Sequence, residues 1–261
     1  MTSQGALLLI LGLGVLIFNV GVGPAFSRGA QQVVKKVAQL STGEQVSRRL
    51  ELAEVYRQQG QWQLAQQLVA DGLQQLAQVA DSSQYWQLRG QAWELQGKLQ
   101  LATGKAEEAL QSWQLAKGKY TQARDDQGAV RTQVYQALAL QELGLHQKAI
   151  AILTPTLSYW QQEEVETQAL SLRLLANILL VTGEVKNAQL QEFIVQFRGA
   201  EISNWDYLQQ VRGLLEESLA ISSPSSVSYQ ESLLSLGNAA RAAYQRFQSN
   251  FERLSLPGCI S

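Results

Sequence analysis

Four glycines divide most of this chain into segments with a helical pattern. Gly60, Gly104, Gly144 and Gly183 each follow a stretch in which apolar or small residues recur at three- and four-residue spacing, and a second such stretch comes after each glycine. Glycine often ends a helix because it adopts the left-handed conformation without steric cost. Each of these glycines therefore predicts a turn between two antiparallel helices.

The first pair of helices is predicted within residues 41–80. Small residues on its inner face allow two helix backbones to approach closely, and larger ones fill the space beside them. Ser41, followed three residues later by Glu44, forms a capping-box pattern that predicts the helix start. The residues that share the inner face are Leu52, Ala53 and Tyr56 before the turn and Trp62, Ala65, Val69 and Gly72 after it.

The same arrangement recurs after the later glycines, which are 44, 40 and 39 residues apart. Ala109, Trp113 and Ala116 have the offsets from Gly104 that Ala65, Val69 and Gly72 have from Gly60. In the third hairpin Pro155 falls inside the second helix and should kink or end it. In the fourth hairpin the second helix is expected to begin with Val185 and Ala188. One hairpin cannot bury both of its faces, so the units are expected to stack. We predict an all-α fold of antiparallel helix hairpins like tetratricopeptide (TPR) repeats, forming a right-handed superhelical stack.

The composition excludes several classes of function. With 21 Lys and Arg against 22 Asp and Glu, the net charge is -1, which disfavours nucleic-acid binding. The chain has one His, His146, and one Cys, Cys259, which are too few for a His/Cys zinc site. They are not expected to form a catalytic dyad either. His146 is more consistent with a packing residue and Cys259 with an inert thiol. The tryptophans at 86, 93 and 113 fit helix seams better than a carbohydrate site. We expect no enzyme activity, cofactor or metal.

The N-terminal segment differs from the rest of the chain. Residues 6–18 are all apolar or glycine, and Ala25, Phe26 and Ser27 offer a cleavage site after them. This favours a signal peptide over residues 1–27 and export to the periplasm or the extracellular space. The alternative is an uncleaved membrane anchor over residues 6–26, which Arg28 and the lysines after it would orient with the body in the cytoplasm. In either case the membrane is contacted only through this segment.

The domain organisation is expected to follow from these patterns. Residues 28–220 are predicted to hold the TPR-like repeats, with a short amphipathic segment at 31–40 capping the stack. The Ser- and Pro-rich residues 221–228 indicate a flexible linker, and residues 229–261 a C-terminal helix and tail.

Four stretches of the chain resemble a known family. They are SWQLAKGKYTQARDDQGAVRTQVYQALALQELGLHQKA, LRLLANILLVTGE, VRGLLEESLAI and SLLSLGNAARA. Over roughly residues 45–245 the chain resembles the N-terminal repeat region of cyanobacterial CHAT-domain TPR proteins. The resemblance implies helical repeats and a binding role. The family often carries a caspase-like protease domain after the repeats, and this sequence is expected to lack it, so no catalytic residue is carried over. The chain is then a truncated gene, a free-standing paralogue or the detached sensor half of a protease system.

The expected binding surface is the concave face, which the first helix of each hairpin lines. Its side chains are polar and of both charge signs, which suits an extended protein or peptide partner in the groove, with Arg131 and Arg173 placed to pair with a carboxylate. The competing interpretation is that they are simply solvated helix residues. The groove positions counted from the turn glycines are Glu54, Arg57, Gln58, Gln91, Glu94, Lys98, Arg131, Gln141, Glu142, Arg173 and Asn177. The predicted partner-binding residues among them are Arg57, Gln58, Gln91, Glu94, Lys98, Arg131, Arg173 and Asn177.

Overall fold

The fold of the chain is entirely helical in the residues that the structure, a computed structural model, describes: 41–183, 192–193 and 207–255. The predicted signal segment, the capping segment at 31–40 and Cys259 lie outside these residues. The chain divides by its packing into two compact units, which meet in the sequence between Asp125 and Asp126. Each unit is described by itself.

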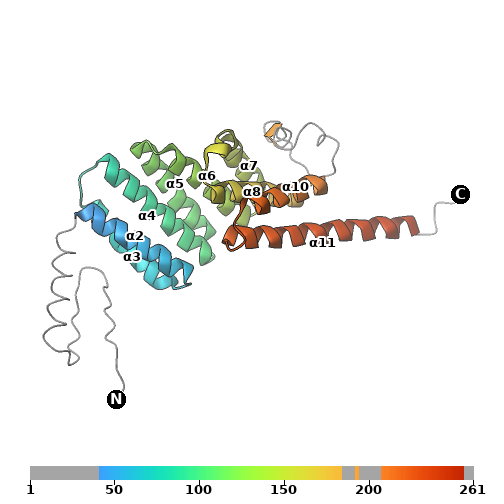
Figure 1. The fold of residues 1–261 in the computed structure, drawn as a ribbon, viewed down its shortest axis with the longest axis horizontal. Coiled ribbons are helices and arrows are strands. Elements are labelled where there is room, and N and C mark those ends of the chain that lie inside the picture. Colours follow the sequence, from blue (N-terminus) through green and yellow to red (C-terminus); the bar gives the residue numbers. More distant parts are fainter. Residues whose placement is uncertain (1–40, 184–191, 194–206, 256–261) are drawn as a thin grey trace, which may run out of the picture. The chain divides into compact units, whose positions relative to one another are not determined.

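Unit 1 contains two helix hairpins (Figure 1). The first consists of α2 (Thr42–Gln58) and α3 (Trp62–Ala77), and the second of α4 (Ser83–Ala102) and α5 (Ala106–Ala123). The helices within each hairpin pack on each other, and α4 also packs on both α2 and α3. The predicted stacking of one hairpin on the next is therefore present in this unit.

The turn glycines have the predicted left-handed conformation. The φ angles of Gly60, Gly104, Gly144 and Gly183 are 73°, 76°, 71° and 73°, a region that side chains with a Cβ rarely adopt. The start of α2 is also as predicted, because Ser41 accepts a hydrogen bond from the Glu44 backbone N–H and the Glu44 carboxylate accepts one from the Ser41 N–H. Both features are local, which is why the sequence predicts them correctly.

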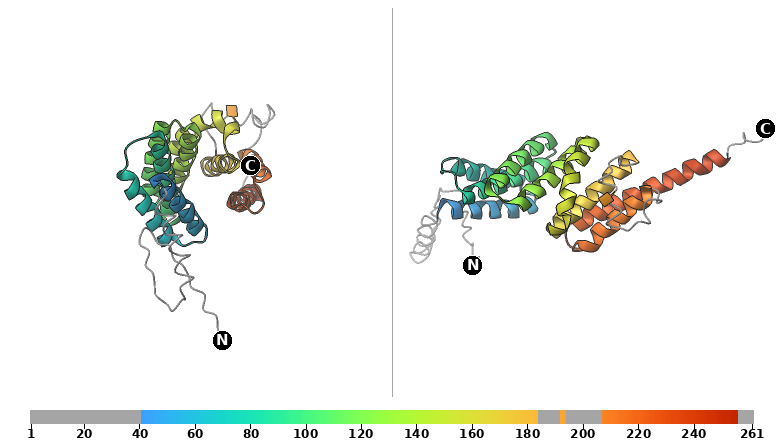
Figure 2. Two further views of the ribbon diagram at one scale, coloured as in Figure 1. Left: turned by 60° about the vertical axis from the view of Figure 1, so that its left-hand side comes forward. Right: turned by 90° about the horizontal axis from the view of Figure 1, so that it is seen from above.

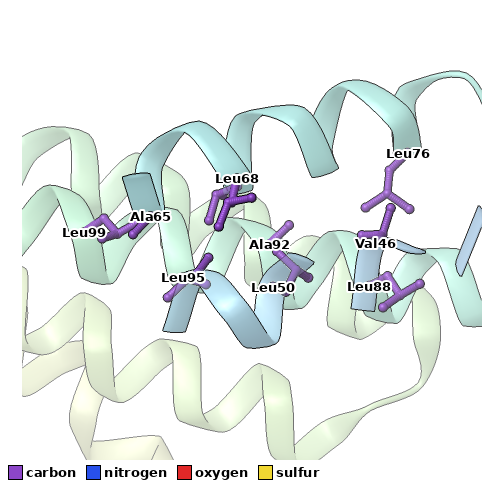
Figure 3. Close-up of a cluster of buried hydrophobic side chains, with 11 residues drawn as sticks. Val46, Leu50, Ala65, Leu68, Leu76, Leu88, Ala92, Leu95 and Leu99 are labelled. Carbon is purple, nitrogen blue, oxygen red and sulfur yellow. The ribbon is translucent and has the colours of Figure 1, made fainter. Parts of the chain in front are cut away.

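The core of unit 1 runs between the two hairpins. Val46 and Leu50 of α2 face Leu68 and Leu76 of α3, and Leu95 of α4 closes the cluster (Figure 3). The small residues predicted at the helix contacts are buried. Ala53 and Ala65 are fully buried, as is the larger Val69 beside them, and a Cβ on Gly72 would lie 3.6 Å from Val46.

Two glycines set the close approach of α4 to α5. A Cβ on Gly90 would lie 2.9 Å from the ring of Tyr120, and one on Gly97 would lie 2.6 Å from Cε2 of Trp113. Both aromatic side chains are fully buried. The indole Nε1 of Trp113 donates a hydrogen bond to the backbone oxygen of Glu94 at 3.0 Å. The second hairpin is therefore built by aromatic rings of α5 that lie on glycines of α4.

Unit 2 begins with a shortened hairpin. After α6 (Asp126–Glu142), the returning helix α7 (His146–Leu153) ends two residues before Pro155, and the chain continues as the 3₁₀ helix η1 (Thr154–Gln162). Proline has no N–H to continue the α-helical ladder and clashes with the carbonyl four residues earlier. The predicted effect of Pro155 is thus confirmed.

The rest of unit 2 is a group of three helices that lie side by side in the views of Figures 1 and 2: α8 (Val165–Thr182), α10 (Tyr207–Ile221) and α11 (Val227–Ser255). In the described residues α10 is the main packing partner of α8. The predicted return helix with Val185 and Ala188 lies outside the described residues.

The predicted linker at 221–228 is a short connection between two packed helices. The Ser222 hydroxyl donates to the Ser218 carbonyl at 2.7 Å, and Ser226 caps α11 by accepting from the Tyr229 N–H. Ser218 and Ser232 share a buried hydrogen bond of 2.8 Å between α10 and α11. α11 therefore belongs to the packed body of unit 2.

α8 is long and apolar enough to cross a membrane, and no other helix of the described residues passes this test. Of its 18 residues, 61% are buried inside the protein, and Leu172, Leu174 and Leu175 are fully buried. This is the pattern of a core helix.

Candidate protein-binding faces

The predicted binding residues lie on the first helices of the hairpins, α2 and α4 in unit 1 and α6 and α8 in unit 2. α2 packs on α4, and α6 packs on α8. In each unit two first helices are therefore neighbours, as the predicted binding face requires.

On α2 the predicted residues form one hydrogen-bonded group. Arg57 donates from Nε and Nη2 to the two carboxylate oxygens of Glu54, at 2.8 and 2.7 Å, and Gln58 Nε2 donates to Glu54 Oε1 at 3.0 Å. Partial burial disfavours the charged form of Glu54, but the hydrogen bonds and charge of Arg57, with the charge of Lys98, lower its pKa. Glu54 is therefore ionised at neutral pH, and Arg57 is held in a fixed, two-pronged orientation.

Glu54 of α2 and Lys98 of α4 occupy equivalent positions in the first two hairpins. Each lies six residues before its turn glycine, Gly60 or Gly104, and the Lys98 charge acts on the Glu54 carboxylate. The two helices that carry these positions also pack on each other. This is the relation on which the predicted groove depends.

Glu94 has a different role from the one predicted. It is only 6% exposed, and its carboxylate accepts a hydrogen bond from the Tyr120 hydroxyl at 2.8 Å and pairs with Lys98 Nζ at 2.9 Å. A buried carboxylate needs such partners, because leaving it unpaired costs several kcal/mol. The structure thus places Glu94 inside the second hairpin rather than on its solvent face, whereas Gln91 is exposed.

In unit 2, Arg131 and Arg173 lie on the packed helices α6 and α8 and each has an acidic neighbour. Arg131 Nη1 is 3.9 Å from an oxygen of the exposed Glu164. Arg173 Nη2 is 2.6 Å from Glu231 Oε2 of α11. Asn177, one turn after Arg173 on α8, is half-buried.

Arg173 is the most deeply buried of the predicted binding cations. It is 9% exposed, and its Nε has no hydrogen-bond partner in the described residues. Burial lowers the pKa of Arg173, and the charges of Glu231 and Glu142 act in the opposite direction. The carboxylate that pairs with Arg173 is therefore supplied by this chain itself. Sequence reasoning missed Glu231 because no local pattern relates residues so far apart in the chain.

The remaining chemical candidates do not assemble into a site in the described residues. His146 is half-buried at the start of α7, and its Nδ1 has no hydrogen-bond partner there, which fits the predicted packing role. The part of the chain that the structure describes holds no group of three or more His, Cys, Asp or Glu side chains that could bind a metal.

Comparison with known proteins supports the fold. No family model and no curated protein matches the sequence. Among solved structures, BtubC (BKLC) from P. vanneervenii has a TM-score of 0.55 at 15% identity, covering 87% of each chain. One structure of a putative kinesin light chain of Podosopora anserina with nearly identical TPR-like repeats has a TM-score of 0.52 at 18% identity, covering 81% of this chain and 92% of that one. Another structure of it has a TM-score of 0.50 at 19% identity, covering 80% and 91%. At these identities the similarity concerns the fold alone, and the chain has the all-α fold of TPR-like repeats.

Proposed function

We propose that this protein is a non-catalytic interaction module that binds an extended segment of another protein along the faces of its first helices. The observation that carries the proposal is the packing of α2 on α4, which makes two first helices neighbours in unit 1. A stack of this kind presents polar side chains at regular intervals, which suits recognition of a peptide by side-chain hydrogen bonds. The fold shared with TPR-like proteins supports the same role.

Within unit 1, Arg57 and Gln91 are the best candidates for contacts with the partner. Arg57 is held by Glu54 with its guanidinium half-exposed, and Gln91 is exposed on α4. Glu94 is excluded from this role by its bonds to Tyr120 and Lys98. In unit 2, Arg131 remains a candidate, whereas Arg173 could bind a partner carboxylate only by exchanging Glu231 for it.

A peptide selected from a random display library on the full-length protein provides the probe for this face. We expect the Arg57→Ala/Gln91→Ala variant to bind it at least tenfold more weakly, since loss of a charged anchor at a desolvated interface costs about 2 kcal/mol. Calorimetry measures the affinities. The control is Lys117→Ala/Gln114→Ala, which also removes one cation and one glutamine, in this case from the second helix α5. Equal affinity of both variants would show that the peptide does not bind the first helices.

A narrower alternative is that the module regulates a caspase-like CHAT protease encoded separately. The support for it is the resemblance of four stretches of the sequence to the repeat region of cyanobacterial CHAT-domain TPR proteins. A CHAT-domain gene directly beside the gene of this protein would favour this alternative over a general scaffold.

We also propose that the protein is exported after removal of residues 1–27, or is anchored in the membrane by residues 6–26. The apolar run at 6–18 and the small residues near Ser27 support the first form. N-terminal sequencing of the native protein is expected to begin at Arg28. An intact N-terminus in a carbonate-resistant membrane fraction would instead establish the anchored form.

A further inference from the structure

The C-terminal helix α11 is longer than the first helices of the hairpins. It has 29 residues, against 17 in α2, 20 in α4, 17 in α6 and 18 in α8. Ser232, Ser235 and Ala239 are buried on the side that packs in unit 2. Beyond this contact α11 continues as one helix past the end of α10 (Figure 1).

A second side of α11 carries an exposed apolar stripe. Leu233, Gly237, Ala240 and Tyr244 follow one another at spacings of four, three and four residues, and all four are exposed, Leu233 by 46% and Tyr244 by 61%. In the sequence, Phe247, Phe251 and Leu254 continue the alternation. We call these seven positions the α11 stripe. Strict alternation of three and four residues is the requirement for a seam with another helix, since it keeps the apolar positions on one line.

Gly237 shows that this seam is open in the described part of the chain. A Cβ built on Gly237 meets no atom within 4 Å. In the second hairpin, by contrast, the helical glycines Gly90 and Gly97 receive the rings of Tyr120 and Trp113 from the neighbouring helix. In the second hairpin, glycines that face aromatic rings thus bring two helices into close contact.

We propose that the α11 stripe pairs with the α11 stripe of a second copy of this chain, in antiparallel orientation about a two-fold axis. In one antiparallel register position 240 lies opposite 244, 237 opposite 247, and 233 opposite 251. Each layer then combines a small or medium residue with an aromatic one, Ala240 with Tyr244 and Gly237 with Phe247. The two-fold axis repeats each layer, so the surface is complementary to itself.

The alternatives fit the stripe less well. A parallel pair would place Gly237 opposite Gly237 and Tyr244 opposite Tyr244, leaving a void in one layer and crowding in the next. A membrane surface would gain little from Gly237 and Ala240, which offer almost no apolar area. The paired positions run from 233 to 251 of each copy, so the seam is about 27 Å long and one helix wide, and we expect a concentration-dependent dimer.

Sedimentation of the full-length protein over a range of concentrations tests the pairing. We expect the wild type to shift from monomer to dimer as its concentration rises, and the Ala240→Glu/Tyr244→Glu variant to dissociate at least tenfold more readily. The control Asn238→Glu/Gln245→Glu adds the same charge to exposed positions of α11 outside the stripe and should dimerise like the wild type. All four positions are exposed, so helicity and the melting temperature of the monomer should be unchanged.

An exchange of side chains tests the register. Ala240→Tyr alone places two aromatic residues in a layer and Tyr244→Ala alone leaves two small ones, so each should weaken the dimer. The double exchange restores one large and one small residue to each layer and should recover the dimer. A wild type that stays monomeric, or a stripe variant that dimerises fully, overturns the proposal. The proposal is also overturned if the wild type is monomeric and binds phosphatidylserine vesicles while the Ala240→Glu/Tyr244→Glu variant does not bind them. That result would identify the stripe as a membrane surface. None of these results depends on the peptide-binding faces.

Discussion

Replacing Trp113 with alanine is expected to lower the free energy of unfolding by about 3–5 kcal/mol, the usual cost of removing a buried tryptophan. The indole is 1% exposed, lies against Gly97 and donates a hydrogen bond to the Glu94 carbonyl. Its removal leaves a cavity between α4 and α5 that these two helices cannot close without moving. Urea denaturation followed by circular dichroism measures the loss.

Trp86→Ala is the matched control for this variant. Trp86 belongs to the same unit, but it is only half-buried, and the cations of Arg89 and Lys119 lie 4.8 and 4.5 Å from its ring centre. Such contacts are worth about 0.5–1 kcal/mol each at exposed sites, so the expected loss is well below that of Trp113. Equal losses would mean that Trp113 is not a central contact of the second hairpin.

The predictable parts of this fold are those set by residues near one another in the sequence. Gly60 and its three counterparts determine turns through a single φ angle, Ser41 and Glu44 determine a helix start, and Pro155 ends α7. The repeating offsets of Ala65 and Ala109 from their turn glycines then fix which helix faces meet. These features required no knowledge of tertiary contacts.

The binding residues were less predictable, because a position on a first helix does not determine whether its side chain faces a partner or is held by another helix of the same chain. Glu94 was expected on the groove and is held inside the hairpin by Tyr120, a residue of the next helix. Arg173 was expected to face a partner and pairs with Glu231 of α11. In both cases the deciding partner comes from a helix whose packing the sequence pattern did not specify.

The pairing of α8 with α10 illustrates the same limit. Periodicity after Gly183 predicts a return helix beginning at Val185, which lies outside the described residues, and it does not predict that α10 packs on α8. The contact is fixed by buried groups such as the Ser218 hydroxyl of α10, which donates to the Ala169 carbonyl of α8 at 2.9 Å. A serine on the buried face of a helix gives no sequence signal of its distant acceptor.

The contrast between two helical glycines provides a sharper test of the contact between α4 and α5. Gly97→Ala is expected to lower the free energy of unfolding by about 1–3 kcal/mol, as overpacking of a filled core does. The new methyl group would lie 2.6 Å from Cε2 of the buried Trp113 ring, so the indole or the helix must shift. This cost opposes the gain of about 1 kcal/mol that alanine brings to a helix in place of glycine.

Gly118→Ala isolates that gain, because Gly118 is exposed on α5 and a Cβ there meets no atom within 4 Å. We expect this variant to be more stable than the wild type by about 0.5–1 kcal/mol. Thermal and urea unfolding of the two variants should therefore give shifts of opposite sign. In a Trp113→Leu background the penalty of Gly97→Ala should shrink or vanish, since the smaller side chain leaves room for the methyl group. A stabilising Gly97→Ala in the wild-type background would show that Trp113 does not rest on Gly97 and that the two helices are farther apart than their glycines indicate.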